Sequence, residues 1–154
     1  MNNPASNPAR VYLDVCALCR PFDDPQQVRI RMETSAVELI LAHIRRGKIE
    51  LIVSPVHQIE TKAISDAEER NHLLLLLDQF SNSVDLDLDE TRRRAEILIS
   101  EGLGVADAAH LAFAEAAGAD FITVDDRLLK QCRRIRARVW YGSSQSFCEK
   151  EDLR

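Results

Sequence analysis

The chain has 154 residues, of which 45% are hydrophobic, and its formal net charge is −5 at pH 7. This length gives one domain with a substantial core, and the apolar content excludes a mainly disordered chain. The negative charge argues against indiscriminate nucleic-acid binding but leaves room for a local basic face. No apolar run approaches the roughly 18 to 20 residues that span a bilayer, so we expect no membrane association.

The first elements follow from local patterns. Residues 1–9 contain no apolar segment, so we interpret them as a ragged leader and not as a secretory signal. Four cysteines without an export signal indicate reduced thiols and a cytoplasmic location. A short β-favouring run at 10–13 predicts a strand that ends at Asp14. A loop over 15–26 and a helix over 28–46 follow.

The middle of the chain alternates between strand and helix patterns. The predicted elements are a buried strand at 49–53, a helix that starts at Ser54-Pro55 and carries Glu60, a helix around the leucine run 73–77, an edge strand at 84–88 and a helix at 90–101.

The segment 102–126 is the most informative part of the sequence. Residues 105–117 are almost all small or apolar, which predicts a buried helix that ends at Gly118. A strand over 119–124 follows and stops at Asp125-Asp126. An ionised carboxylate in a buried helix costs several kcal/mol unless something compensates it, so Asp107 needs a partner. A last strand is expected at 138–141, and the tail 142–154 yields no prediction.

Strands that alternate with helices predict an α/β fold with a mostly parallel sheet and helices on both faces. In such sheets, ligands gather outside the carboxyl ends of the strands. Asp14 and Asp125 follow strands directly, and we place Glu60 and Asp107 in early turns of helices. We therefore expect these four acids to meet in one cleft at that edge.

Carboxylates that pack together repel one another, so one takes a proton or a cation occupies the gap. Ligand sets made of oxygen suit Mg²⁺ or Mn²⁺ better than zinc. Such a cation activates water and stabilises charge on a phosphoryl group. The plainer alternative is that each acid caps a turn, sits at a helix start or is solvated.

Four segments resemble the PIN-domain family of metal-dependent ribonucleases. They are VYLD ending at Asp14, LIVSPVHQIE ending at Glu60, VADAAHLAFA containing Asp107 and FITVDDRLL containing Asp125. They occur in the family's order across residues 11–140, and the third is similar to the family's D-A-x-H-L-A helix.

The resemblance implies a three-layer α/β/α sandwich that hydrolyses RNA phosphodiester bonds with Mg²⁺ or Mn²⁺. Asp14, Glu60, Asp107 and Asp125 would be both the metal ligands and the catalytic residues. The family's fourth acid follows a threonine by two positions, as Asp125 follows Thr123. Thr123 and Asp126 are therefore accessory candidates, and Asp126 is expected to cap the turn into 127–129.

The chain is most similar to the small bacterial toxins of this family, which implies an antitoxin protein as partner and a homodimer. Many members have Thr or Ser and then Asn after the first Asp, whereas Val15-Cys16 stands here. Cysteine is a weak hydrogen-bond partner. A PIN-like module that binds RNA or a partner without cleaving therefore remains an alternative.

A basic run follows the Asp pair, with no acid among its members: Arg127, Lys130, Arg133, Arg134, Arg136 and Arg138. The first four are candidates for phosphate contacts with RNA, which would supply affinity independent of sequence. The alternative is a solvated helix face.

Other motifs are weaker. The CxxC of Cys16 and Cys19 has no second pair to complete a zinc site, which favours plain thiols. His110 lies three residues after Asp107, and we interpret it as a packed residue near the site and not as a ligand. The leucine run is interpreted as core.

Overall fold

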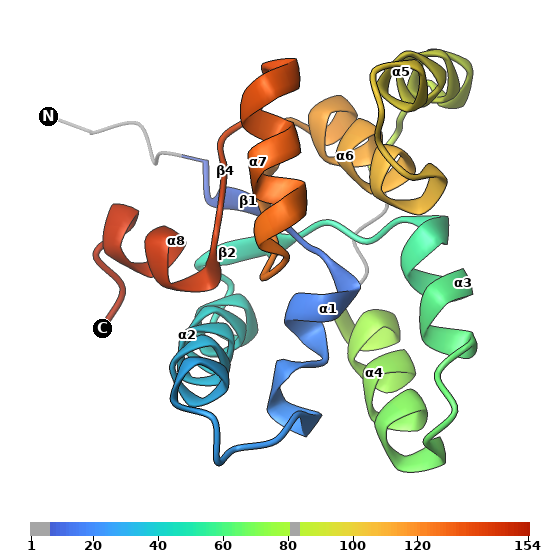
Figure 1. Ribbon diagram of the computed structural model, residues 1–154. Coiled ribbons are helices and arrows are strands. Elements are labelled where there is room, and N and C mark those ends of the chain that lie inside the picture. The colour runs from blue at the N-terminus through green and yellow to red at the C-terminus, as the bar shows by residue number, and fades with distance from the viewer. Residues whose placement is uncertain (1–6, 81–83) are drawn as a thin grey trace, which may run out of the picture.

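The computed structural model describes residues 7–80 and 84–154. The elements in chain order are β1 (Ala9–Leu13), α1 (Val15–Leu18), the 3₁₀ helix η1 (Arg20–Phe22), α2 (Val28–Arg45), β2 (Ile49–Leu51), α3 (Pro55–Lys62), α4 (Ala67–Phe80), α5 (Leu88–Ser100), α6 (Val105–Ala117), β3 (Asp120–Ile122), α7 (Asp126–Ile135), β4 (Tyr141–Gly142) and α8 (Ser144–Lys150) (Figure 1).

The strands form one sheet in the order β2-β1-β3-β4, and every neighbouring pair is parallel. In the register of β1 with its neighbours, Val11 lies opposite Leu51 and Leu13 lies opposite Ile122. Parallel neighbours need long crossover connections, which the helices provide. The predicted parallel sheet is therefore confirmed.

Side chains alternate along a strand, so the apolar residues of these strands point to both faces of the sheet. Helices cover each face. Val11 and Leu13 point into a core shared with α2, α4 and α8. Tyr12 and Phe121 point to the other face, into a core shared with α5, α6 and α7. Figure 1 shows the two helical layers on opposite sides of the sheet. The three-layer α/β/α sandwich is thus confirmed.

Local signals set the ends of several helices. The Ser54 side chain accepts from the backbone of Val56, and Pro55 occupies the first turn of α3. Gly118 ends α6 with φ of 62°, a left-handed conformation that favours glycine. Across residues 7–80 and 84–154, no helix combines the length and the apolar surface that a lipid bilayer would require.

The predicted edge strand at 84–88 is wrong. Residues 84–87 belong to no strand, and Leu88 is already the first residue of α5. The Asp87 carboxylate accepts from the backbone N–H groups of Asp89 and Glu90, both at 3.1 Å. The alternating aspartates therefore supply a helix cap instead of the polar face of a strand.

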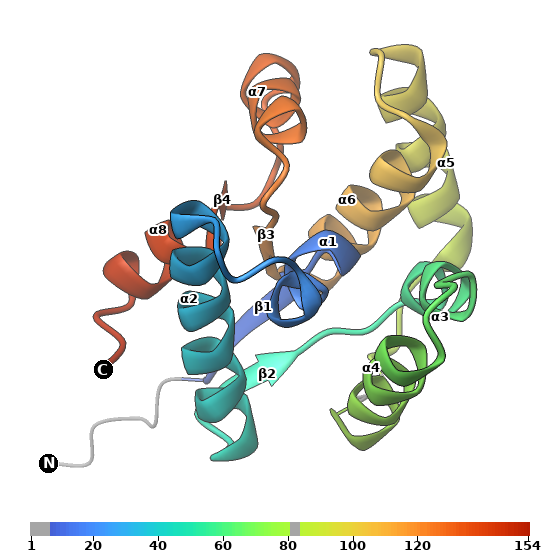
Figure 2. The same ribbon diagram turned by 60° about the horizontal axis from the view of Figure 1, so that its bottom comes forward.

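Three other segments differ from the sequence predictions. The predicted loop 15–26 contains α1 and η1, and the strand expected at 138–141 is shortened to Tyr141–Gly142. The tail 142–154 is structured, because α8 packs along α2 and buries Phe147 completely (Figures 1 and 2). Of the predicted leader 1–9, residues 1–6 lie outside the described residues, and β1 begins at Ala9.

Candidate functional site

Asp14 directly follows β1, the strand that lies between β2 and β3. Its backbone N–H donates to the carbonyl of Ile122 at 2.9 Å, which extends the β1–β3 ladder by one residue. The residue is 6% exposed. Asp14 is thus a nearly buried carboxylate at the carboxyl edge of the sheet.

Thr123 connects this acid to the end of β3. The Thr123 hydroxyl is fully buried and donates to Asp14 Oδ2 at 2.8 Å. Thr123 Oγ1 accepts in turn from the backbone N–H of Asp125 at 3.2 Å. The accessory residue suggested by the family resemblance therefore links Asp14 to Asp125.

Asp125 and Asp126 have different contacts. Asp125 Oδ1 accepts from the backbone of Arg127 at 2.9 Å and of Leu128 at 3.2 Å, so Asp125 is the N-cap of α7. The expectation that Asp126 caps this turn is wrong, because Asp126 is already the first helical residue. Its exposed carboxylate instead accepts from two nitrogens of Arg29, at 2.7 and 2.8 Å.

Arg29 also holds a buried carboxylate on its own helix. Its Nε donates to Glu33 Oε1 at 2.5 Å, while Arg20 Nε donates to Glu33 Oε2 at 2.9 Å. Arg29 Nη2 donates as well to the carbonyl of Val124 at 3.2 Å. The guanidinium groups of Arg20 and Arg29 thus compensate the charge of Glu33. Arg29 also joins the start of α2 to the connection between β3 and α7.

Asp107 lies in the first turn of α6 and is half-buried. It lines a pocket of about 190 Å³ together with Asp125 and Arg127. Burial raises the pKa of the Asp107 carboxyl, and the charges of Asp14, Asp125 and Glu60 raise this pKa further. Mutual repulsion of this kind is characteristic of acids gathered in one place.

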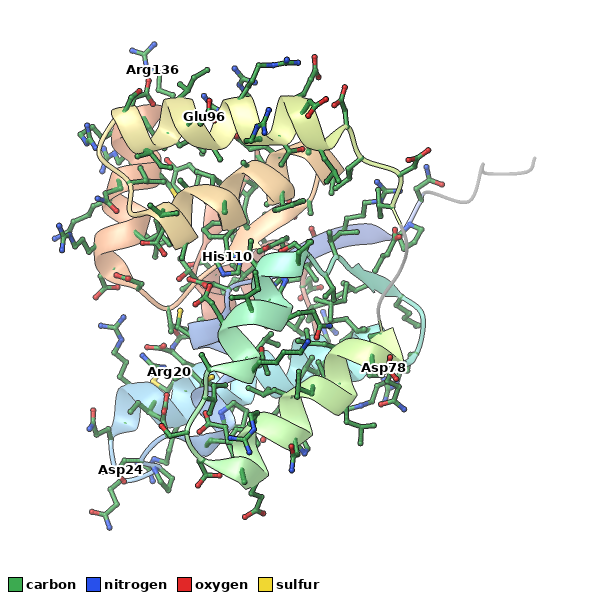
Figure 3. All side chains as sticks on the ribbon, turned by 90° about the vertical axis from the view of Figure 1, so that its right-hand side faces the viewer. Arg20, Asp24, Asp78, Glu96, His110 and Arg136 are labelled. Carbon is green, nitrogen blue, oxygen red and sulfur yellow. The ribbon has the colours of Figure 1, made fainter. Side chains whose placement is uncertain are left out.

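Glu60 reaches the same neighbourhood from α3. Its Oε1 makes a short hydrogen bond with His110 Nε2, and this bond is the main cause that lowers the pKa of Glu60. His110 Nε2 also lies 3.8 Å from Asp14 Oδ1. Figure 3 shows His110 in the interior, between α3 and α6. We call Asp14, Glu60, Asp107 and Asp125 together the acidic site.

Tyr12, Ser54 and His57 are buried polar residues behind the acidic site, and the sequence did not predict their contacts with one another. Tyr12 OH lies 2.6 Å from Ser54 Oγ and 2.5 Å from His110 Nδ1. His57 Nδ1 accepts from the Ser54 backbone at 3.0 Å, and His57 Nε2 lies 2.6 Å from the carbonyl of Leu13. The signal that could have found them was Tyr12 itself, since a buried tyrosine hydroxyl requires a partner.

Cys16 occupies the position at which the sequence departs from the family pattern. Its thiol donates to Asp14 Oδ2 at 3.2 Å and lies 3.3 Å from Thr123 Oγ1. Burial raises the pKa of Cys16 to about 12, so the group is a neutral thiol. Cys16 therefore supplies a weak hydrogen bond where the asparagine of the family pattern would supply a stronger one from its amide.

The basic run lies on α7 and just beyond it. All six of its side chains are exposed, while Leu128 and Cys132 bury the inner face of α7. Arg127 lines the pocket of Asp107 and Asp125, and Arg134 donates to the carbonyl of Glu101 at 2.7 Å. A cationic helix face thus starts at the acidic site.

The acidic site offers only carboxylate oxygens, which are the donors that Mg²⁺ and Mn²⁺ prefer. The repulsion that raises the pKa of Asp107 is the charge imbalance that a cation would relieve. Within the described part of the chain, no three His, Cys, Asp or Glu side chains already converge as ligands for one metal ion. The donor chemistry therefore fits a divalent cation, although the four carboxylates are not arranged as a preformed ligand set.

The fold and the acidic site define an α/β/α protein that carries four carboxylates near the carboxyl edge of a parallel sheet. The chain belongs to the PIN-domain family, because the family model, PIN domain, matches residues 11–134. This match contains all four residues of the acidic site.

Among solved structures, FitAB bound to an IR36 DNA fragment is similar, with 14% identity and a TM-score of 0.53 over 87% of this chain and 94% of that chain. FitAcB from Neisseria gonorrhoeae shows 12% identity and a TM-score of 0.49 over 88% and 98% of the two chains. At such identities the likeness concerns the fold alone. A comparison with curated protein sequences gives no match.

Proposed function

We propose that this PIN-domain protein is a ribonuclease that depends on Mg²⁺ or Mn²⁺ and hydrolyses RNA phosphodiester bonds. The observation that carries the proposal is that acids from separate segments lie near one another: His110 contacts both Glu60 and Asp14, and Asp107 and Asp125 line one pocket. Burial and the charges of the neighbouring acids raise the pKa of Asp107. Acids that repel one another at a site where ligands bind favour a proton or a cation between them.

Asp14, Glu60, Asp107 and Asp125 would hold the cation, directly or through water. When bound, the cation supplies compensation for the negative charge on the phosphodiester. The protein's own residues orient the ligands: Thr123 and Cys16 hydrogen-bond Asp14, and His110 hydrogen-bonds Glu60. Asp125 is held by its backbone and by its role as a helix cap.

The exposed cations of α7 are proposed to bind the RNA backbone. Arg127, Lys130, Arg133 and Arg134 lie on the helix that Asp125 caps, and Arg127 lines the pocket formed with Asp107 and Asp125. Contacts of this type provide affinity independent of sequence and bring a phosphate toward the carboxylates.

We further propose that the protein is the cytoplasmic toxin of a toxin–antitoxin pair, held inactive by an antitoxin protein, and that it forms a homodimer. The sequence resemblance to the small bacterial toxins supports this assignment. The similar fold of FitAB is compatible with it.

A second candidate is a PIN-like module that binds RNA or a protein but does not cleave. Two observations favour it: Cys16 replaces a stronger hydrogen-bond donor beside Asp14, and the described side chains do not yet form a ligand cluster.

Incubation of mixed RNA with the purified protein in Mn²⁺, in Mg²⁺ and in EDTA tests the proposal. We expect cleavage with either cation and none in EDTA, and Asp14→Asn should remove it. RNA binding without cleavage in all three conditions would establish the second candidate instead.

A further inference from the structure

A continuous line of buried hydrogen bonds runs from the sheet to the acidic site. Ser54, Tyr12 and His110 are 4%, 0% and 1% exposed. Their polar atoms connect Ser54 Oγ to Tyr12 OH at 2.6 Å and Tyr12 OH to His110 Nδ1 at 2.5 Å. The line then passes from His110 Nε2 to Glu60 Oε1. Buried polar groups of this kind have to satisfy one another.

The two ring nitrogens of His110 have separate partners. Nε2 donates to Glu60 Oε1, because a carboxylate oxygen accepts, and Nδ1 lies against the Tyr12 hydroxyl. Ser54 Oγ holds the Tyr12 hydroxyl in turn. The Tyr12 hydroxyl therefore fixes the orientation of the His110 ring.

His57 anchors the other end of this line. Its Nδ1 accepts from the Ser54 backbone at 3.0 Å, so its Nε2 carries the proton and donates to the carbonyl of Leu13 at 2.6 Å. Leu13 precedes Asp14 in the chain. The connected side chains of His57, Ser54 and Tyr12 therefore hold both the backbone next to Asp14 and the His110 ring that contacts Glu60.

We propose that His110 is a positioning residue that holds Glu60 Oε1 and leaves Oε2 to face a divalent cation, with Tyr12 keeping the His110 ring in the orientation that places Nε2 against Glu60. This inference rests on the proposed function. A carboxylate fixed at one oxygen loses less rotational freedom when the other binds a cation. His110 thus acts on the cation through Glu60 and not as a ligand itself.

Two amide variants separate positioning from simple packing. In His110→Gln the amide nitrogen takes the place of Nε2 and can still donate to Glu60. In His110→Asn the shorter amide takes the place of Nδ1, keeps the Tyr12 contact and cannot reach Glu60. Tyr12→Phe retains the contacts of the ring with His57 and His110 and removes only the hydroxyl that orders His110. His43→Asn, on α2, is the control for loss of a histidine elsewhere.

Binding of Mn²⁺ is measured by the electron paramagnetic resonance signal of the free ion, without RNA, and folding by circular dichroism. We expect His110→Asn to weaken Mn²⁺ affinity about 10- to 100-fold, in the range found for groups that orient metal ligands. Tyr12→Phe should weaken it less, while His110→Gln should restore most of it and His43→Asn should not change it.

Equal affinity in the wild type, His110→Asn and Tyr12→Phe would overturn the positioning role alone. Equal weakening by His110→Asn and His110→Gln would also overturn it, because packing would then explain the loss. If His110→Asn does not fold, Tyr12→Phe decides between these outcomes. A wild-type protein that binds no Mn²⁺ would overturn the proposed function and this role together.

Discussion

Thr123 donates a hydrogen bond of 2.8 Å to Asp14, a residue 109 positions earlier in the chain. The bond is buried and joins the ends of two neighbouring parallel strands. Because its acceptor belongs to a carboxyl group at the edge of the sheet, this one contact serves both the fold and the acidic site.

Thr123→Val keeps the shape of the side chain and removes the hydroxyl. We expect a loss of about 1.5 to 3 kcal/mol in the free energy of unfolding, the usual value of a hydrogen bond to a charged group. Urea denaturation measures it. Thr61→Val is the matched control, because the Thr61 hydroxyl is equally buried and has no hydrogen-bond partner among the described residues. If both variants lose the same stability, the bond to Asp14 contributes nothing specific.

Asp107→Asn should stabilise the metal-free protein at neutral pH. The raised pKa means that ionised Asp107 is disfavoured in the folded state, and the substitution removes that charge. We expect a melting temperature about 2 to 4 °C higher at pH 7 in EDTA. The gain should shrink as pH falls through the raised pKa of Asp107 and should be lost below the ordinary value of about 3.9, where the folded and unfolded carboxyls are both protonated.

Asp126→Asn is the control of opposite sign. Arg29 lowers the pKa of Asp126, so the ionised form is favoured in the folded state and its loss should lower the melting temperature slightly. Destabilisation by Asp107→Asn in EDTA would identify Asp107 as a structural acid.

The adjacent acids Asp125 and Asp126 should differ in RNA cleavage. Asp125→Asn should remove most of the activity and leave α7 intact, since asparagine caps helices about as well as aspartate. Asp126→Asn should retain activity, because Asp126 is paired with Arg29. Cleavage assays in Mn²⁺ beside thermal melts separate the two effects. Equal loss of cleavage in both variants would assign the cation to both acids.

Replacing the first two cations of α7, Arg127→Ala with Lys130→Ala, should weaken RNA binding for all sequences alike. The slope of log affinity against log salt should flatten by about 0.7 for each phosphate of single-stranded RNA that the protein no longer neutralises. Fluorescence anisotropy at several salt concentrations measures this. Arg92→Ala with Arg93→Ala on α5 is the control, since both side chains are exposed. If the salt dependence of RNA affinity has the same slope in both double variants, the cations of α7 form only a solvated face.

His57 should make the protein less stable in mild acid. Burial lowers the pKa of His57 to about 4, and the neighbouring His110 acts in the same direction. An unfolded chain protonates histidine near 6.5, so the unfolded state binds more protons between about pH 6.5 and 4. Stability should therefore fall through this window as pH falls, by roughly 3 kcal/mol.

Urea denaturation from pH 7 to 4 and the NMR titration of the His57 ring test this expectation. In His57→Gln the same acid-dependent loss should be smaller, because no proton is taken up at that position on unfolding. A His57 ring that titrates near 6.5 in the folded protein would contradict the prediction.

The sequence was sufficient for the parallel arrangement of the sheet and for the strands that precede Asp14 and Asp125. Strand and helix periods differ, and the run from Val105 to Asp125 shows both with clear stops. The same periodicity failed at 84–88, because alternating Asp and apolar residues suit a strand and a helix cap equally well. Only the position of Asp87 as the N-cap of α5 in the folded protein distinguishes the strand from the helix cap.

The contacts that surround the four acids could not be predicted from sequence patterns. Tyr12 stands in an apolar strand and looks like core, and its hydroxyl meets His110 98 positions later. Arg29 resembles any solvated helix cation until the fold brings Asp126, 97 positions away, beside it. Such pairings depend on which sheet face or helix end each segment reaches in the folded protein. The sequence alone does not specify these positions.

The strand order β2-β1-β3-β4 has a consequence for the newly made protein. β1 cannot pair with β3 until the chain has been made that far, because strand β3 and Asp125 lie more than 100 positions after Asp14. The backbone hydrogen bonds within helices α1 to α5 are local and can form earlier. A chain whose synthesis has not passed Asp125 therefore has an incomplete acidic site, and any activity that depends on the site starts only after that point.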